Sequence, residues 1–121
     1  LKKDVIFTGY VPSEELPFLF TSATVFAYPS LYEGFGFPIL EAFACRTPVV
    51  ASSSSSIPEV AGNGALLLSP FEPVLWASAF RELLSDREKR EDLVKRGLKR
   101  LPLFTWRNTA IETMKVYKEM I

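Results

Sequence analysis

The sequence predicts an α/β fold, in which a parallel sheet is sandwiched by helices and followed by a run of C-terminal helices. Short apolar runs alternate with helical patterns over residues 5–68, and only helical patterns follow Pro70. The 121 residues suffice for one domain, and 48% hydrophobic with 23% charged residues is typical of globular proteins. No apolar run approaches the ~20 residues that cross a bilayer.

The first elements already alternate. The apolar run over residues 5–8 predicts a buried strand, and Ser13 can cap a helix over 14–22 whose first turn is acidic, as the helix dipole prefers. Residues 24–28 predict a second strand, which Pro29 ends. A strand, a helix and a second strand in this order indicate a crossover unit.

A glycine-rich turn lies between two glutamates, Glu33 and Glu41, which are eight positions apart. Its glycines allow a tight backbone that can approach a ligand closely. Pro38 suits the first position of a short helix over 39–45, and the free N–H groups at that helix N-terminus suit a phosphate. An anion-accepting turn with a carboxylate on each side suggests a phosphorylated, hydroxyl-rich ligand.

The alternation continues with strands predicted over residues 48–51, which are rich in β-branched side chains, and over 65–68. Between these strands, a capping box at 56–59 opens a short helix that runs to Ala61, and a turn follows over 62–64.

Three helices are predicted after Pro70. Residues 85–88 match a second capping box, and Thr105 can cap the last helix. The expected apolar faces are Trp76, Phe80, Leu83 and Leu84, then Leu93, Gly97, Leu98 and Leu101, then Trp106, Ala110, Met114, Tyr117 and Ile121.

This topology places three loops at one edge of the sheet. Alternating strands and helices imply parallel strands with right-handed crossovers, and ligands bind at the carboxyl ends of such strands. The loops over 9–12, 29–37 and 52–56 emerge at that edge. The serine run within 52–56 is therefore interpreted as a strand-to-helix loop and not as a low-complexity segment.

The zero net charge hides an uneven distribution. Residues 4–80 hold seven acids and one base, whereas residues 81–121 hold eleven bases and seven acids. Backbone N–H groups beside two carboxylates would not hold a diphosphate alone, so cations must come from outside residues 4–80. The basic cluster over 87–100 is interleaved with acids, which favours a solvated helix face over a nucleic-acid site. Contact with an anionic membrane surface is the lesser alternative.

Two features of composition limit the chemistry. The chain has no histidine, which excludes a zinc site or a Ser-His-Asp triad within it. The single cysteine, Cys45, cannot form an internal disulfide, which agrees with a reducing compartment. Its apolar neighbours favour a small core residue over a nucleophile.

Five segments, taken in order, resemble the donor-binding C-terminal domain of the retaining family 4 glycosyltransferases, which have two facing Rossmann-like domains, the GT-B fold. The resemblance covers essentially the whole chain. It implies a single nucleotide-sugar-binding domain over 1–121, truncated at its start and lacking the N-terminal acceptor domain. The segments are 7–11, 29–38, 41–45, 47–51 and 57–60.

The family implies retaining transfer of a sugar from a UDP-, GDP- or ADP-sugar donor to a carbohydrate or lipid-linked acceptor, in polysaccharide or glycolipid biosynthesis. The leaving phosphate serves as the base, so the lack of histidine is no objection. No metal or other cofactor and no nucleic-acid partner are expected. The implied location is the cytoplasm, with peripheral attachment to the inner face of the membrane as a further expectation. A non-catalytic sugar-nucleotide-binding or regulatory module of the same fold is the alternative function.

The resemblance also assigns roles to residues. Glu33, the candidate catalytic residue, would accept hydrogen bonds from the donor sugar and place negative charge near the developing oxocarbenium ion. Glu41 would hold the ribose diol, whose two hydroxyls a carboxylate can accept together. Backbone N–H groups around Gly36 and Phe37 would meet the sugar and the diphosphate, and at least one of the two nearby phenylalanines is expected to pack within the protein. The remaining implied donor-binding residues are Gly34 and Phe35 in the turn, and Tyr10 and Val11 near the base.

Two departures from the family stand out. Arg46 occupies a position where the family has a glycine in the left-handed region at the helix end, a conformation that Arg adopts at a cost of ~1 kcal/mol. The family's basic pair that clamps the diphosphate lies before residue 1, so this fragment alone is expected to be inactive.

Overall fold

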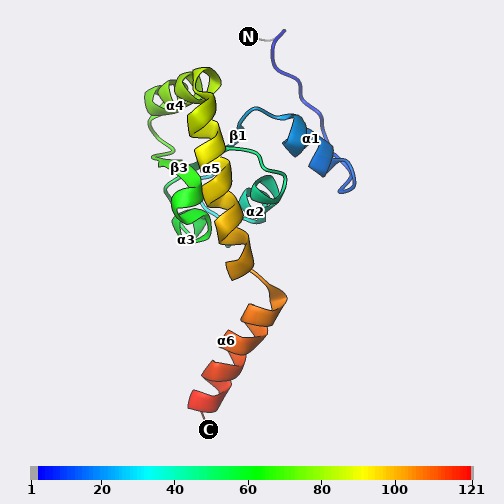
Figure 1. Ribbon diagram of the computed structural model, residues 1–121, viewed down its shortest axis with the longest axis vertical. Coiled ribbons are helices and arrows are strands. Elements are labelled where there is room, and N and C mark those ends of the chain that lie inside the picture. Colours follow the sequence, from blue (N-terminus) through cyan, green and yellow to red (C-terminus); the bar gives the residue numbers. More distant parts are fainter. Residues whose placement is uncertain (1–2, 121) are drawn as a thin grey trace.

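The computed structural model describes residues 3–120 and contains a sheet of three parallel strands in the order β1-β2-β3 (Figure 1). The strands are β1 (Phe26–Tyr28), β2 (Val49–Ser52) and β3 (Ala65–Leu68). The connections are helix α2 (Phe37–Ala44), helix α3 (Ile57–Ala61) and the 3-10 turn Gly62–Gly64. Val49 of β2 pairs with both Phe26 and Ala65, so the predicted parallel sheet with helical crossovers is confirmed.

The other helices precede or follow the sheet. They are α1 (Leu16–Ser22), α4 (Pro73–Ser85), α5 (Arg87–Arg100) and α6 (Trp106–Glu119), with a 3-10 turn at Leu101–Leu103. Figure 1 shows α5 running down the front of the body and α6 projecting away from it. The three helices predicted after Pro70 are confirmed. Within residues 3–120, no helix is both long and apolar enough to cross a membrane.

The core lies on both faces of the sheet. On one face, Phe43 of α2 packs in a cluster with Val49 and Ala51 of β2. On the other face, Leu83 of α4 packs in a cluster with Val50. Successive residues of a strand point to opposite faces, so these two clusters confirm that helices sandwich the sheet.

Helix α5 packs against the turn before β3 at a contact that requires glycine. A Cβ at Gly97 would lie 2.5 Å from a ring carbon of Phe43. A Cβ at Gly64 would lie 2.8 Å from the same ring and 2.9 Å from Gly97 Cα. Both glycines therefore allow an approach between backbone and ring that any larger residue would prevent.

The strand predicted over residues 5–8 is wrong. These residues form neither a helix nor a strand, and Ile6 and Phe7 are 86% and 93% exposed. A strand requires a hydrogen-bonded neighbour, and no other part of residues 3–120 supplies one here. The loop over 9–12 consequently does not follow a strand of this sheet.

The first helix starts later than predicted, and one predicted cap is absent. Helix α1 begins at Leu16 with Glu15 in the cap position, and no side chain caps it, so Ser13 does not have its predicted role. Ser56 occupies the cap position of α3, but its side chain does not bond to the helix. The prediction of a capping box at 56–59 is therefore wrong, although the helix predicted after it is present.

The later caps are closer to the prediction. Helix α5 is capped by Asp86, one residue after the predicted start of the box, and its carboxylate accepts a bond from Lys89 N–H at 3.0 Å. Thr105 caps α6 as predicted, accepting from Asn108 N–H at 3.1 Å.

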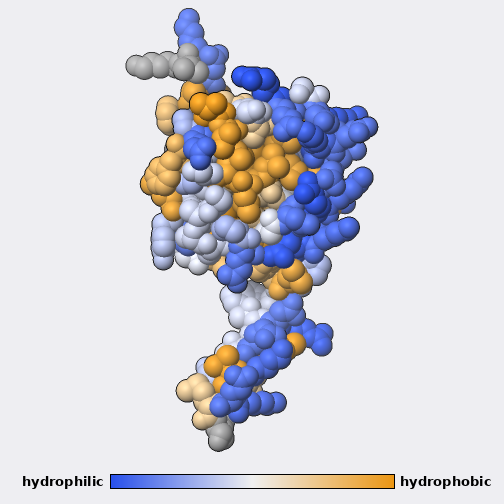
Figure 2. Space-filling model, turned by 90° about the vertical axis from the view of Figure 1, so that its left-hand side faces the viewer, coloured by the Kyte–Doolittle hydropathy of each residue, from blue (hydrophilic) through white to orange (hydrophobic). Residues whose placement is uncertain are grey.

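One residue of the apolar face predicted on α4 is exposed, and so is every described residue of the face predicted on α6. Leu84 is 63% exposed, because the preceding Leu83 takes the buried position on α4. Helix α6 has no buried residue, and Trp106 is 85% exposed, so the stripe predicted there has no covering partner within residues 3–120. Ile121 lies outside the described residues. Figure 2 shows hydrophobic surface gathered on one face of the body beside a strongly hydrophilic face, with smaller hydrophobic areas on α6.

Candidate functional site

Two loops meet at the carboxyl edge of the sheet. The glutamate loop (residues 29–36) leaves β1 and leads into α2, and the serine loop (residues 53–56) leaves β2 and leads into α3. Their predicted meeting is confirmed by hydrogen bonds between them. Among residues 3–120, the third expected loop, over 9–12, makes no hydrogen bond to either of the other two.

Serine hydroxyls hold the backbone of the glutamate loop. Ser55 Oγ donates to the carbonyl oxygen of Glu33 at 2.7 Å and accepts from the N–H of the same residue at 2.9 Å. Ser56 Oγ donates to the carbonyl oxygens of Glu33 at 2.9 Å and Phe35 at 2.8 Å. These bonds explain why Ser56 does not cap α3.

Two further serines act on the start of the same loop. The hydroxyls of Ser52 and Ser54 both donate to the carbonyl oxygen of Ser30, the latter at 3.1 Å. From the sequence, the serine run was interpreted only as a strand-to-helix loop. The one available signal was that a run of hydroxyl side chains sits at the ligand-binding edge of the sheet.

The Glu33 carboxylate is oriented by two hydroxyl groups. Ser30 Oγ donates to Glu33 Oε1 at 2.7 Å, and the hydroxyl of Tyr28 lies within hydrogen-bonding reach of the same carboxylate. The bond from Tyr28 and then the bond from Ser30 lower the pKa of Glu33 below its ordinary value. Glu33 is therefore held in the ionised form, which accepts hydrogen bonds but donates none.

Tyr28 connects the two glutamates electrostatically. Burial, the hydrogen bond to Glu33 and the charges of Glu33 and Glu41 raise the pKa of Tyr28 to about 12. Both carboxylates of the predicted pair therefore act on one phenol, and Glu33 acts on it more strongly than Glu41. Sequence reasoning missed Tyr28, although it ends the strand that leads into the glutamate loop.

Glu41 lies on the second turn of α2 and is exposed. It lines a hollow of about 250 Å³ with residues of α1 and the end of α2, among them Leu16 and Cys45. Cys45 is half-buried beside this hollow and is less enclosed than predicted.

The turn before α2 contains Gly36, whose positive φ is a backbone conformation that glycine adopts easily. Gly36 is buried with a φ of 116°, in the region that favours glycine, and occupies the cap position of α2. The helix begins at Phe37, so Pro38 is its second residue and not its first. The first N–H groups of α2 have no acceptor within the helix, as at any helix start. Gly34 lies exposed in the loop between Glu33 and Phe35.

The two phenylalanines of this turn contact other rings, although Phe35 is 37% and Phe37 is 61% exposed. The rings of Phe35 and Phe37 are 4.8 Å apart between centroids, and Phe35 meets Phe104 edge-on at 5.8 Å. The predicted packing of at least one of the two phenylalanines is therefore present. In contrast, Tyr10 is 88% exposed and Val11 is half-buried, outside the bonds that join the two loops.

Arg46 adopts the backbone conformation expected at its position. Its φ is 58°, in the left-handed region. Its N–H donates to the carbonyl oxygen of Phe43 at 3.0 Å, and the N–H of Thr47 donates to that of Ala42 at 2.9 Å. These two bonds form a Schellman motif, which closes α2 although the residue is not glycine.

The arrangement of strands, helices and carboxyl-edge loops defines one half of a GT-B glycosyltransferase. Sucrose-phosphate synthase from Thermosynechococcus elongatus matches the structure with a TM-score of 0.83 and 31% identity, over 98% of this chain and 30% of that one. The N-terminal domain of trehalose-6-phosphate phosphatase from Candida albicans also gives a TM-score of 0.83, over 95% of this chain and 26% of that one. At 19% identity, that match shows the fold alone.

The chain belongs to the glycosyl transferases group 1 family, whose sequence pattern matches residues 1–100. It is 43% identical over 112 residues to O-antigen chain mannosyltransferase B of Escherichia coli, covering 93% of this chain. It is 36% identical over 123 residues to an MMP alpha-(1->4)-mannosyltransferase of Mycolicibacterium hassiacum, covering 98% of this chain. The chain spans 29% and 30% of the length of these two relatives.

Proposed function

We propose that this chain is the donor-binding part of a retaining glycosyltransferase. The whole protein would bind a nucleotide diphosphate sugar and transfer the sugar to a hydroxyl of a carbohydrate or lipid-linked acceptor. The observation that carries this proposal is the oriented Glu33 carboxylate at the carboxyl edge of the sheet, with Glu41 on the helix that follows it. Glu33 is oriented by two hydroxyls and by serine-bound backbone, and Glu41 acts on the same tyrosine from the next helix.

The lowered pKa of Glu33 suits one chemical role better than another. A general acid needs a pKa near the working pH, whereas a carboxylate that stays ionised can accept bonds from sugar hydroxyls and stabilise positive charge. In the proposed reaction, Glu33 faces the developing oxocarbenium ion and Glu41 accepts from both hydroxyls of the ribose.

The turn between the glutamates would hold the rest of the donor. The backbone N–H groups around Gly36 and Phe37 are proposed to meet the sugar and the diphosphate, together with cations from outside residues 4–80. Tyr10 and Val11 are proposed to reach the base. No metal or other cofactor is proposed. Because the two relatives named above are described as mannosyltransferases, a nucleotide diphosphate mannose is the first donor to test.

The test is ligand binding by the complete protein, measured as thermal stabilisation with a panel of UDP-, GDP- and ADP-sugars. Glu41→Ala should weaken binding of both the bare nucleotide diphosphate and the sugar-bearing donor, by about tenfold. Glu33→Ala should weaken mainly the sugar-bearing donor, because the bare nucleotide lacks the group that it contacts.

The matched control is Glu88→Ala, which removes an exposed acid from the first turn of α5 and should leave donor binding unchanged. If both site variants bind every nucleotide like the wild type, the site assignment is wrong. If the complete protein binds a donor but never transfers its sugar, the non-catalytic alternative replaces the enzyme.

A further inference from the structure

A cleft of about 640 Å³ gathers positive charge at the edge of the sheet opposite to the glutamate loop. It lies between the C-terminal end of α1, the segments that lead into β1 and β2, and one side of α5 from Arg87 to Leu98. Thr24 and Pro48, which line it, precede β1 and β2, whereas Glu33 lies beyond their carboxyl ends. The charged residues that line the cleft are Arg46, Arg87, Arg90, Lys95 and Glu91.

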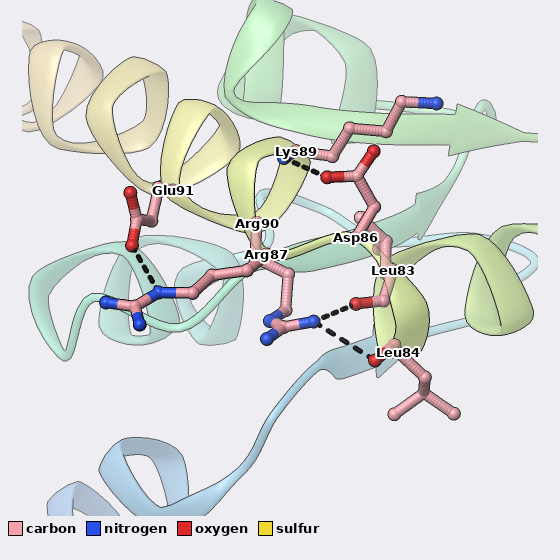
Figure 3. A network of polar contacts seen from close by, with 7 residues as sticks. All are labelled: Leu83, Leu84, Asp86, Arg87, Lys89, Arg90 and Glu91. Carbon is pink, nitrogen blue, oxygen red and sulfur yellow. Dashed lines mark hydrogen bonds and ion pairs between the residues drawn. The ribbon is translucent and has the colours of Figure 1, made fainter.

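Two of the four cations are held in place by the protein itself (Figure 3). Arg90 Nη1 donates to the carbonyl oxygens of Leu83 and Leu84 at the end of α4. This leaves the N–H groups on its other two nitrogens for a ligand. Arg87 Nε bonds to Glu91 Oε1 at 2.7 Å, so the single acid of the cleft orients a cation. The hydrogen bond and charge of Arg87, and then the charges of Lys95 and Arg90, lower the pKa of Glu91.

The other two cations have no carboxylate partner. Within residues 3–120, neither Arg46 nor Lys95 takes part in an ion pair, and both side chains are exposed at the cleft. Arg46 stands in the left-handed region, where glycine would fit without strain. The hydroxyls of Ser22 and Thr24 also line the cleft and form no hydrogen bond with the described residues.

We propose that this cleft binds a phosphate group, carried either by a soluble phosphoester or by a lipid headgroup. Four cations against one acid leave an excess of three positive charges, and guanidinium groups match the oxygens of a phosphate in pairs. The volume exceeds that of a bare phosphate and leaves room for part of the molecule that carries it. The site is separate from the proposed donor site and does not depend on it.

The experiment measures binding by the complete protein in two arms. Isothermal titration with inorganic phosphate and glycerol 3-phosphate tests a soluble source. Co-sedimentation with phosphatidylglycerol-containing vesicles, against vesicles of phosphatidylcholine alone, tests a headgroup source. Binding in either arm, weakened about tenfold by Lys95→Gln, supports the proposal and identifies the source. A wild-type protein that binds in neither arm overturns it.

Arg46→Gly separates binding from folding. Glycine suits the backbone at this position, so the variant should melt at the same temperature as the wild type or higher, while phosphate binding weakens about tenfold. A variant that keeps wild-type binding shows that Arg46 is only a helix-end residue, and this overturns the site.

Lys99→Gln is the matched control, because Lys99 is an exposed cation on the same helix that does not line the cleft. It removes the same charge as Lys95→Gln and should leave binding within about twofold of the wild type. Equal losses in the two variants would mean attraction to net charge alone, and the proposed site would be wrong.

Discussion

Helices α2 and α6 both carry apolar residues at helical spacing, but only α2 has become part of a core. The eight residues of α2 include three that are buried, Ile39, Ala42 and Phe43, whereas none of the fourteen residues of α6 is buried. The difference lies in the connections. Helix α2 joins two paired strands, so the chain holds it against the sheet, whereas α6 follows the turn Leu101–Leu103 and projects away from the body (Figure 1). An apolar stripe therefore predicts that a face is to be covered, but not what covers it.

The largest expected effect comes from breaking the packing around α2. Gly97→Ala would place a Cβ 2.5 Å from the Phe43 ring and should destabilise the protein by about 2 kcal/mol in urea denaturation. Gly34→Ala is the control, since nothing lies within 4 Å of its Cβ position. Helix propensity alone predicts the opposite sign for Gly97→Ala, a gain of about 1 kcal/mol. A stabilised variant would therefore refute the close contact.

An intermediate effect is expected where the serine loop holds the glutamate loop. Ser56→Ala removes two hydrogen bonds, to Glu33 and Phe35, and should cost about 1 kcal/mol of stability and weaken donor binding. Ser53→Ala is a matched control, because the Ser53 hydroxyl bonds to no described residue. Equal effects of the two substitutions in thermal melting would argue against the contact between the loops.

A smaller, local effect is expected at Tyr28. Tyr28→Phe removes the hydrogen bond that lowers the pKa of Glu33 most. This pKa should therefore rise part of the way toward 4.5. A lowered carboxyl pKa stabilises the folded state above the unfolded pKa, and this stabilisation is lost as the pH falls through the folded pKa. The variant should therefore gain less stability from ionised Glu33 at every pH above the unfolded pKa of about 4.5. Carboxyl titration by NMR measures the change, and an unchanged pKa would exclude the Tyr28 bond.

The smallest effect is expected on α6. Trp106→Ser changes a side chain that is 85% exposed and should alter stability by less than about 0.5 kcal/mol in urea denaturation. A loss several times larger would mean that α6 packs against something in solution. The contrast between α6 and α2 would then not hold.

The sequence was sufficient to predict a strand or helix where its residue pattern and the elements beside it in the chain favour the same structure. Strands β2 and β3 and helix α2 were all predicted, because each depends on residues close in the chain. Residues 5–8 have an equally strong strand pattern but pair with no strand among residues 3–120. For that run the missing pairing partner decides the structure, and no local pattern reveals it.

In the candidate site too, features set by nearby residues were predicted and features set by another segment were not. Glu33 and Glu41 were predicted from their spacing around the glycine turn, and the charges of both raise the pKa of Tyr28. The roles of Ser56 and Tyr28 were not found, because both act on residues of another segment or a later turn. Ser56 matched a capping box by spacing, but its hydroxyl binds backbone that lies more than twenty residues earlier in the chain.

The serine loop also joins the glutamate loop mechanically to α3. Ser56 bonds to the backbone of Glu33 and Phe35 through its side chain, and its own carbonyl oxygen accepts the N–H of Val60 at 3.1 Å. A ligand that moves the glutamate loop should therefore also displace Ser56 and the first turn of α3, which Ser56 begins. Hydrogen exchange at the Val60 amide would then report occupancy of a site that this residue does not touch.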